Sequence, residues 1–304
     1  MDPVLSAALR SWDWRVELIV FLGAAVIIYS IGWLRLRKRT LNQKSRNRWR
    51  AGAAWHPLIY NLGILILAIA LMSPIDVLGS QLFMMHMVQH ILLVMIIPPL
   101  LLLSNPLVFF LWGLPSGSRK LVGGWLRPGS QFRKTIKTLT GTGIVWLAYV
   151  IVIWGWHDPN AYSFALENNF VHDLEHLSFF IVAMLFWWHI IGSGPRIHKP
   201  LSAGGRFAYT ISAIPPIMIA GIAIAFAQDP IYPHYDAVPR LWGISTLEDQ
   251  RIAGVLMWVL GSMMYIIAAL IIVARWLQKE ESKPWLPESN WATEEALAAP
   301  GVEK

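Results

Sequence analysis

Two pairs of histidines have the residue type and spacing of metal ligands on a helix. His86 and His90 end the segment that begins at Gln81, and His172 and His176 form a second pair. Residues four apart lie on one face of an α-helix, one turn above the other. Two ring nitrogens stacked in this way can bind one metal ion, as the paired histidines of helical zinc motifs do. The chemistry that these pairs predict is metal binding.

A structural role is the alternative for either pair. A histidine inside a membrane helix is often an interhelical contact, with one ring nitrogen donating to a carbonyl. For one pair alone, the structural role and the ligand role are about equally favoured. Two pairs with the same spacing, each at the head of an apolar segment, favour a shared metal site.

Other side chains near the pairs could act as ligands or orient them. Met85 and Met87 flank His86, and Glu175 precedes His176. Thioether and imidazole without thiolate suit Cu(I), although methionine is also an ordinary filler of apolar cores. A carboxylate beside a ligating imidazole can orient the ring. We therefore expect copper, as Cu(I), ahead of zinc or iron. The candidate additional ligands or supporting residues are Met85, Met87, Glu175 and His157.

The composition is that of an integral membrane protein. Of 304 residues, 56% are hydrophobic and 14% are charged, whereas about a quarter of a soluble domain is charged. The net charge of +7 does not indicate nucleic-acid binding, because the basic residues fall between apolar segments. The absence of cysteine excludes disulfides, thiolate metal sites and iron–sulfur clusters.

The apolar segments predict an all-α fold, a polytopic bundle of seven transmembrane helices. A spanning helix needs about 20 apolar residues. The first segment is expected to span rather than to be a cleaved signal peptide, because its basic flank follows the apolar run. A single membrane domain is predicted over residues 1–279, and the polar tail 280–304 is expected to be disordered. The predicted spans are about Trp14–Leu34, Trp55–Met72, Leu78–Leu103, Leu139–Trp156, Phe170–Ile191, Phe207–Ala227 and Ile252–Trp276.

The basic residues predict the orientation of these spans. Of 25 lysines and arginines, 21 fall on one side if the chain crosses the membrane at every predicted span. The positive-inside rule places that side in the cytoplasm, with the N-terminus outside and the C-terminus inside. Both histidine pairs, and with them His157, are then expected in the outer half of the membrane or at its outer surface.

Several further features give structural expectations. Pro98-Pro99 and Pro215-Pro216 should kink or break their helices, which is tolerated only where neighbours bond the freed carbonyls. The apolar piece from Asn105 to Trp112 is too short to span and is expected along the cytoplasmic interface. Most outer acidic residues, Asp249 among them, are expected to be solvated. Five aromatic residues are expected in an interfacial belt, namely Trp154, Trp156, Tyr162, Tyr232 and Tyr235.

Three separated runs carry a resemblance to a known family, and the resemblance as a whole covers roughly Trp55 to Arg275. They are Met85-His-Met-Val-Gln-His90 through Pro98-Pro99-Leu-Leu, His172-Asp-Leu-Glu-His-Leu-Ser-Phe179 leading to Phe186-Trp-Trp188, and Asp249-Gln-Arg-Ile-Ala-Gly254 followed by Met257-Trp258. The sequence resembles the multi-spanning CtaG family of cytochrome c oxidase assembly factors. His189, directly after the paired tryptophans, departs from the family pattern and is given no family role.

The resemblance implies a multi-pass protein of the bacterial plasma membrane that matures a haem–copper oxidase without catalysing a reaction. Its implied partners are the lipid bilayer, oxidase subunit I or II and a periplasmic copper donor, and nucleic acid is not among them. Carried onto this sequence, the resemblance implies delivery of copper held by His86, His90, His172 and His176.

Three other functions remain as alternatives. Haem handling would need one axial histidine from each helix, because two histidines on one helix cannot reach opposite faces of the iron. A di-iron oxygenase would need about eight histidines in HxxHH boxes, a pattern absent from this sequence. A proton or ion transporter would use buried ionisable groups as a relay, and few carboxylates lie within the predicted spans. Zinc and haem are therefore the less favoured ligands.

Overall fold

The computed structural model describes residues 6–7, 10–41, 53–194 and 196–282, and over these residues the fold is all-helical, as predicted. Six helices are long and apolar enough to cross a membrane, or seven if one bent pair is counted as a span. The chain therefore has the architecture of a multi-pass membrane protein. Its long elements are α2 (Val16–Leu41), α4 (Trp55–Met72), α6 (Phe83–Ile91) continued by η1 (Leu92–Ile96) and α7 (Ile97–Leu103), α11 (Thr142–Trp156), α13 (Asn169–Ile191), α14 (Ala203–Ile211), α15 (Ile214–Ala225), and α17 (Thr246–Val255) continued by η2 (Leu256–Leu260) and α18 (Gly261–Glu281).

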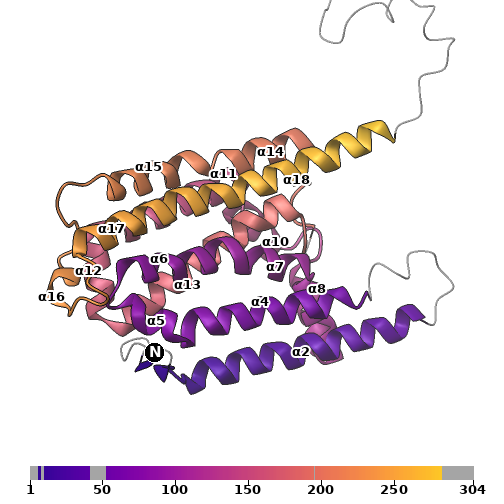
Figure 1. Ribbon diagram of the computed structural model, residues 1–304. Helices are drawn as coiled ribbons and strands as arrows, with labels where there is room; N and C mark the ends of the chain where they lie inside the picture. The colour runs from indigo at the N-terminus through magenta and orange to yellow at the C-terminus, as the bar shows by residue number, and fades with distance from the viewer. Residues whose placement is uncertain (1–5, 8–9, 42–52, 195, 283–304) are drawn as a thin grey trace, which may run out of the picture.

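Short helices join these elements. They are α5 (Pro74–Gly79), α8 (Pro106–Gly113), α9 (Ser116–Trp125), α10 (Gln131–Leu139), α12 (Pro159–Glu167) and α16 (His234–Ala237). Figure 1 places α5, α12 and α16 at one end of the bundle and α8 at the other. We call these the α16 end and the α8 end.

The third, fourth and seventh predicted spans differ in form from the observed helices, and the first and sixth differ in their bounds. The third begins at Phe83, because the preceding turn forms the separate helix α5. The fourth is a bent pair, in which α10 and α11 meet at 53° around Thr140 and Gly141. The seventh is longer than predicted, with a continuous helix of 36 residues from Thr246 to Glu281. That helix includes the first residues of the predicted tail, and residues 283–304 lie outside the described part of the chain.

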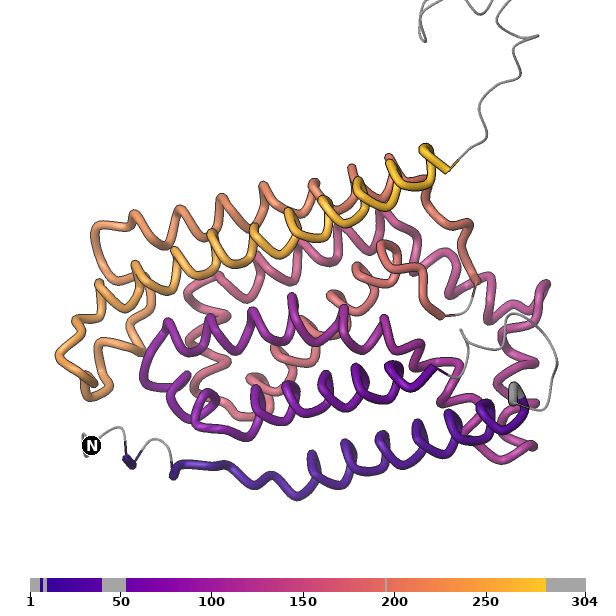
Figure 2. Tube along the Cα trace, turned by 45° about the vertical axis from the view of Figure 1, so that its right-hand side comes forward, coloured from indigo at the N-terminus to yellow at the C-terminus, as the bar shows by residue number. Residues whose placement is uncertain are grey.

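The third and fifth spans form the centre of the bundle. Figures 1 and 2 show α6–η1–α7 and α13 between α2 and α4 on one side and α15 and α17–α18 on the other. In its most apolar stretch, 61% of the third span is buried and 44% of the fifth, against 17% for α2. The two histidine-bearing helices are therefore the most enclosed spans, which shields their side chains from lipid.

The proline pair of the third span does not break it. Pro98 and Pro99 occupy the first turn of α7, directly after the π-helical turn η1. The carbonyl of Val94 would be bonded by a donor four or five residues later, and both of those residues are prolines without an N–H. The indole Nε1 of Trp187 donates to this carbonyl at 2.9 Å. The expected compensation by a neighbouring helix is thus confirmed for this pair.

The second pair, Pro215-Pro216, also stands in the first turn of a helix, α15. The first residues of a helix have no intrahelical acceptor for their N–H groups, so prolines at these positions remove no hydrogen bond. The sixth span passes through a short break at Ser212 and Ala213 and continues as one apolar stretch of 23 residues.

The short apolar helix α8 packs across α2. A Cβ atom on Gly32 would lie 1.8 Å from the carbonyl oxygen of Phe109, and one on Gly113 would lie 2.1 Å from that of Ile28. Only glycine allows the two backbones to approach so closely. This contact ties the N-terminal helix to the α8 end of the bundle.

Candidate metal centre

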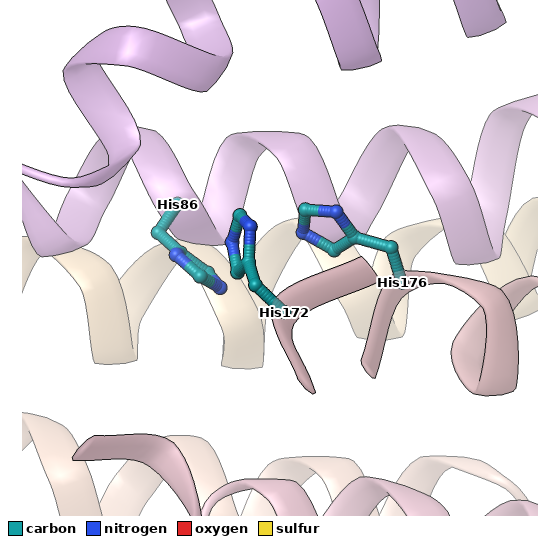
Figure 3. Close-up of side chains that lie close together, drawn as sticks. All are labelled: His86, His172 and His176. Atoms are coloured by element: carbon teal, nitrogen blue, oxygen red, sulfur yellow. The ribbon is translucent and has the colours of Figure 1, made fainter. Parts of the chain in front are cut away.

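Four histidine rings meet in the space between α6 and α13, near the α16 end. Ring centroids within each pair are 4.2 Å apart, both for His86 and His90 and for His172 and His176. Across the helices, the centroids of His86 and His172 are 5.4 Å apart, as are those of His90 and His176. Figure 3 shows three of the rings together in this space. The structure thus brings together all four histidines that the sequence predicted as one site.

The potential ligand atoms form two groups that share one residue. One group is His86, His172 and His176, and the other is His86, His90 and Glu175. Within each group the ligand atoms lie within 4.8 Å of one another. The Glu175 carboxylate Oε1 is 3.5 Å from Nε2 of His90 and 3.8 Å from Nε2 of His86. Because His86 belongs to both groups, it is the central residue of the centre.

The polar atoms of this centre are buried without hydrogen-bond partners. Neither ring nitrogen of His86 or His90 has a partner, and neither carboxylate oxygen of Glu175 has one. The Nε2 atoms of His172 and His176 are in the same state. A buried polar group without a partner costs about 1–3 kcal/mol, and here eight such atoms gather in one place. A cation bound between them would use one lone pair from each ligating residue and so offset part of this cost.

Histidines elsewhere in the described chain provide a contrast. The ring of His189 donates from Nε2 to the carbonyl of Thr140 at 2.8 Å, and that of His198 bonds the Thr140 hydroxyl at 2.8 Å. His56 bonds the carbonyl of Ala53. His234 bonds the carbonyl of Ser80 at 3.0 Å. Each of these four rings has a hydrogen-bond partner, as expected of a histidine with a structural role. The rings of the centre have nitrogens without partners.

The geometry fits a metal ion after a small contraction. Two ligands about 2 Å from one ion are at most about 4 Å apart, so ligand atoms within 4.8 Å need to approach by less than about 1 Å. The donor atoms are imidazole nitrogens and carboxylate oxygens. Such a set suits copper, zinc or iron, and the ligand role of the four histidines stays a prediction.

The remaining candidates lie around the centre in different positions. Met87 is buried and, with His90 and His157, lines a cavity of about 40 Å³ next to the histidine centre. His157 donates from Nδ1 to the carbonyl of Ile153 at 2.6 Å, which leaves Nε2 with a lone pair and no partner. Burial lowers the pKa of His157 and keeps the ring neutral. Met85 is half-buried and points about 100° away from His86 around the helix.

This small cavity, the thioether chamber, has three methionines in its wall. They come from different elements: Met87 from α6, Met95 from η1 and Met257 from η2. The chamber is almost wholly apolar and adjoins His90. Its volume of about 40 Å³ is enough for roughly one small ion or water molecule.

The helix that carries His86 and His90 begins at a carboxylate from another helix. Leu82, the residue before α6, offers no side-chain cap. Instead Asp249 of α17 accepts hydrogen bonds from the backbone N–H groups of Phe83 and Met84, both at 2.9 Å. Asp249 is fully buried and also bonds Arg240 at 3.2 Å. The expectation that Asp249 is a solvated loop charge is therefore wrong, because it serves as a distant helix cap.

Gln89 holds the same helix against α4 and α5. Its side-chain amide donates to the carbonyl of Ala70 at 2.8 Å and to the carboxylate of Asp76 at 2.6 Å. Residues 89 and 90 are neighbours, so these bonds fix the rotation of α6 that turns His90 towards α13. Sequence reasoning missed this role, although the glutamine lies inside the run that carries the family resemblance.

Three tyrosines cover the centre at the α16 end. Tyr162, Tyr232 and Tyr235 are at most 2% exposed, so their predicted place in an interfacial belt is wrong. The hydroxyls of Tyr162 and Tyr235 are 2.7 Å apart, and Tyr235 donates to the carbonyl of Gly79. The ring of Tyr162 lies 5.0 Å from that of His86. Burial raises the pKa of all three phenols, which remain neutral hydrogen-bond donors.

The other side of the centre opens towards charged residues. A cavity of about 530 Å³, the acidic vestibule, adjoins His172 and includes Asp13, Glu17 and Asp173. Arg15 donates to both carboxylate oxygens of Asp173, each at 2.6 Å. This bidentate pair raises the pKa of Arg15 and places a fixed positive charge beside His172.

Comparisons with known proteins agree with the three sequence runs. A family model described as cytochrome c oxidase caa3 assembly factor matches residues 27–279. Uncharacterised proteins of Mycobacterium bovis and Mycobacterium tuberculosis are each 26% identical over 284 residues, and one of Mycobacterium leprae is 24% identical over 280. The alignments cover 88% of this chain and 40% of each relative, so the chain spans less than half of their length. No solved structure matches the chain significantly.

Proposed function

The chain belongs to the family of cytochrome c oxidase caa3 assembly factors, and on this premise we propose that it binds copper between α6 and α13 and delivers it to the oxidase. Copper is the cargo of this process and no reaction is catalysed. One observation carries the proposal. Five residues, His86, His90, His172, Glu175 and His176, each offer a potential ligand atom in one buried space and carry polar atoms without hydrogen-bond partners.

The surroundings of the centre favour Cu(I) over zinc. Thioether sulfur is a soft ligand that suits Cu(I), and the thioether chamber adjoins His90 with three methionines in its wall. The chain has no cysteine, so a closed thiolate cage of the kind that holds structural zinc is not available. The imidazole rings of the centre and the thioethers of the adjoining chamber are both ligand types that suit Cu(I).

Haem is disfavoured by size. The cavity that adjoins His90 has a volume of about 40 Å³, which is far too small for a porphyrin. The histidine rings across the two helices are only 5.4 Å apart between centroids, and the space is closed by tyrosines at the α16 end. Haem handling remains the second candidate function, to be separated from copper delivery by spectroscopy.

Delivery requires ligands that exchange readily, and the two overlapping ligand groups provide them. An ion held by His86, His172 and His176 could move to His86, His90 and Glu175 while His86 stays bound. Neither group offers a saturated four-ligand cage of histidines and carboxylates. This supports transient binding and release rather than permanent retention.

The proposal includes a location and partners. The distribution of basic residues in the sequence supports an N-out orientation in the bacterial plasma membrane, which places the α16 end and the metal centre towards the outside. Copper would then arrive from a periplasmic donor and leave to oxidase subunit I or II.

Purified protein in detergent is expected to bind about one Cu(I) per chain in competition with a colorimetric Cu(I) chelator. The physical reason is the convergence of unpaired imidazole nitrogens on one small space. The same preparation should bind Zn(II) more weakly. After incubation with haem and removal of unbound haem by gel filtration, it should show no Soret band. Copper delivery through this centre would be excluded by a Soret band that shows stoichiometric haem binding. It would also be excluded if the protein removed no more Cu(I) from the chelator than buffer alone.

Access through the acidic vestibule gives a kinetic prediction. The Arg15 guanidinium holds Asp173 in a bidentate pair beside His172, and its charge repels a cation. We expect Arg15→Gln to accelerate Cu(I) loading about two- to tenfold at low ionic strength, since local charge changes association rates by tenfold or more. Stopped-flow mixing with a Cu(I) donor measures the rate.

A matched control is Arg251→Gln, which removes an exposed arginine of α17 that does not line the vestibule. Its loading rate should equal that of the wild type. Equal rates for Arg15→Gln and the wild type would show that copper reaches the histidines by another route.

A further inference from the structure

A groove of about 580 Å³ runs along the opposite half of the bundle, towards the α8 end. It lies between α7, α13, α14 and α18, and Figure 1 shows α14 and α18 side by side there. None of the histidines, methionines or carboxylates of the metal centre lines it. Its function must therefore be sought in its own residues.

The wall of the groove is divided by polarity along α18. Met264, Ile267 and Ile271 line the part nearer the middle of the bundle, and Arg275 and Lys279 line the last turns. From residue 264 to residue 279 the helix rises about 22 Å. Apolar residues from the last turns of α7 and α13, such as Leu103 and Ile190, also line the groove. The groove is thus apolar along most of its length and basic at one end.

Arg206 of α14 adds a third positive charge to the basic end. Its Nε is buried and has no hydrogen-bond partner. Three cations, Arg206, Arg275 and Lys279, face one carboxylate, Glu280, among the lining residues. Trp276 stands at the same level and is 42% exposed, a position typical of tryptophan at a membrane–water interface. Clustered cations beside an interfacial tryptophan are the features expected of a site for the headgroup of a lipid.

We propose that this groove binds an anionic phospholipid. The phosphate lies against Arg206, Arg275 and Lys279, and one acyl chain follows the apolar wall between α18 and α13. Arginine guanidinium groups suit phosphate oxygens, and basic pockets between membrane helices on the cytoplasmic side bind anionic headgroups. The lipid would give the unpaired Nε of Arg206 an acceptor. This inference does not depend on the copper-delivery proposal.

Native mass spectrometry of the protein extracted from vesicles tests the proposal. The vesicles contain phosphatidylglycerol and phosphatidylcholine with identical acyl chains, so only the headgroup differs. The wild type is expected to retain one phosphatidylglycerol. The double variant R206Q/R275Q should bind it about 30-fold more weakly. Loss of one basic residue near an anionic headgroup weakens binding about five- to sixfold, and the two losses multiply. Binding of phosphatidylcholine should not change.

Two matched variants separate charge from folding. K134Q removes an exposed cation of α10 outside the groove and should leave lipid retention unchanged, whereas R206K/R275K keeps the charges and should restore most of it. Inorganic phosphate at millimolar concentration should not displace the lipid, because it lacks the acyl chain. Equal retention of both lipids by the wild type, undiminished retention by R206Q/R275Q, or full displacement by phosphate would overturn the proposal.

Discussion

Replacing His86 with asparagine is expected to lower the affinity for Cu(I) by more than about 100-fold. Removal of a residue that only orients a metal ligand already lowers the affinity by about 10- to 100-fold, and His86 is proposed to be a ligand itself. His86 is the one residue that belongs to both ligand groups. It is fully buried between the two helices, so water does not readily replace it as a ligand. Loss of His86 leaves two ligands in either group and removes the residue that the two groups share.

The measurement is an equilibrium competition with a Cu(I) chelator, accompanied by oxidase activity in cells that carry only the variant. Oxidase activity should fall together with copper binding while the amount of protein in the membrane is unchanged. His189→Asn is the matched control, because His189 lies on α13 with its ring bonded to Thr140. It should retain wild-type affinity. Wild-type copper binding by His86→Asn would refute the assignment of the centre.

Removing the carboxylate of Asp249 is expected to destabilise the protein by about 2–4 kcal/mol. Two backbone N–H groups at the start of α6 would lose their acceptor, and the loss of a helix cap costs about 0.5–2 kcal/mol. Arg240 would also lose its buried partner, which adds to the cost. Thermal unfolding of Asp249→Ala in detergent should therefore begin several degrees below that of the wild type.

A second readout connects this cap to the metal centre. His86 lies three residues after Phe83, whose N–H is bonded by Asp249, so fraying of the first turn moves its ring. We expect weaker Cu(I) binding in Asp249→Ala. Glu248→Ala is the matched control, since Glu248 belongs to the exposed capping box of α17 with Ser245 and should affect stability by about 1 kcal/mol or less. A variant Asp249→Ala as stable as Glu248→Ala would show that α6 does not need this cap.

The sequence was sufficient for the features that depend on local periodicity. Helix type, the approximate spans and the shared face of His86 and His90 follow from spacing along one segment. Which faces meet depends on packing between segments far apart in the chain. The cap on α6 comes from a residue 166 positions away, and nothing in the local sequence near Phe83 indicates it.

The tyrosines illustrate a different limit. An aromatic residue with a hydroxyl suits both an interface and a buried hydrogen-bonded position, so residue type alone does not distinguish the two. Tyr162 and Tyr235 are buried because their hydroxyls bond each other and the carbonyl of Gly79. The proline pair was treated more successfully: the need for a substitute donor follows from proline chemistry, although its identity as Trp187 does not.

The bond from Trp187 to the carbonyl of Val94 has a mechanical consequence. It joins the two spans that hold the histidine pairs, one turn beyond His90. Axial sliding of one span past the other would stretch this bond at once, whereas a small tilt about it would not. The bond therefore restricts sliding of the two histidine-bearing spans along each other more than it restricts their tilt.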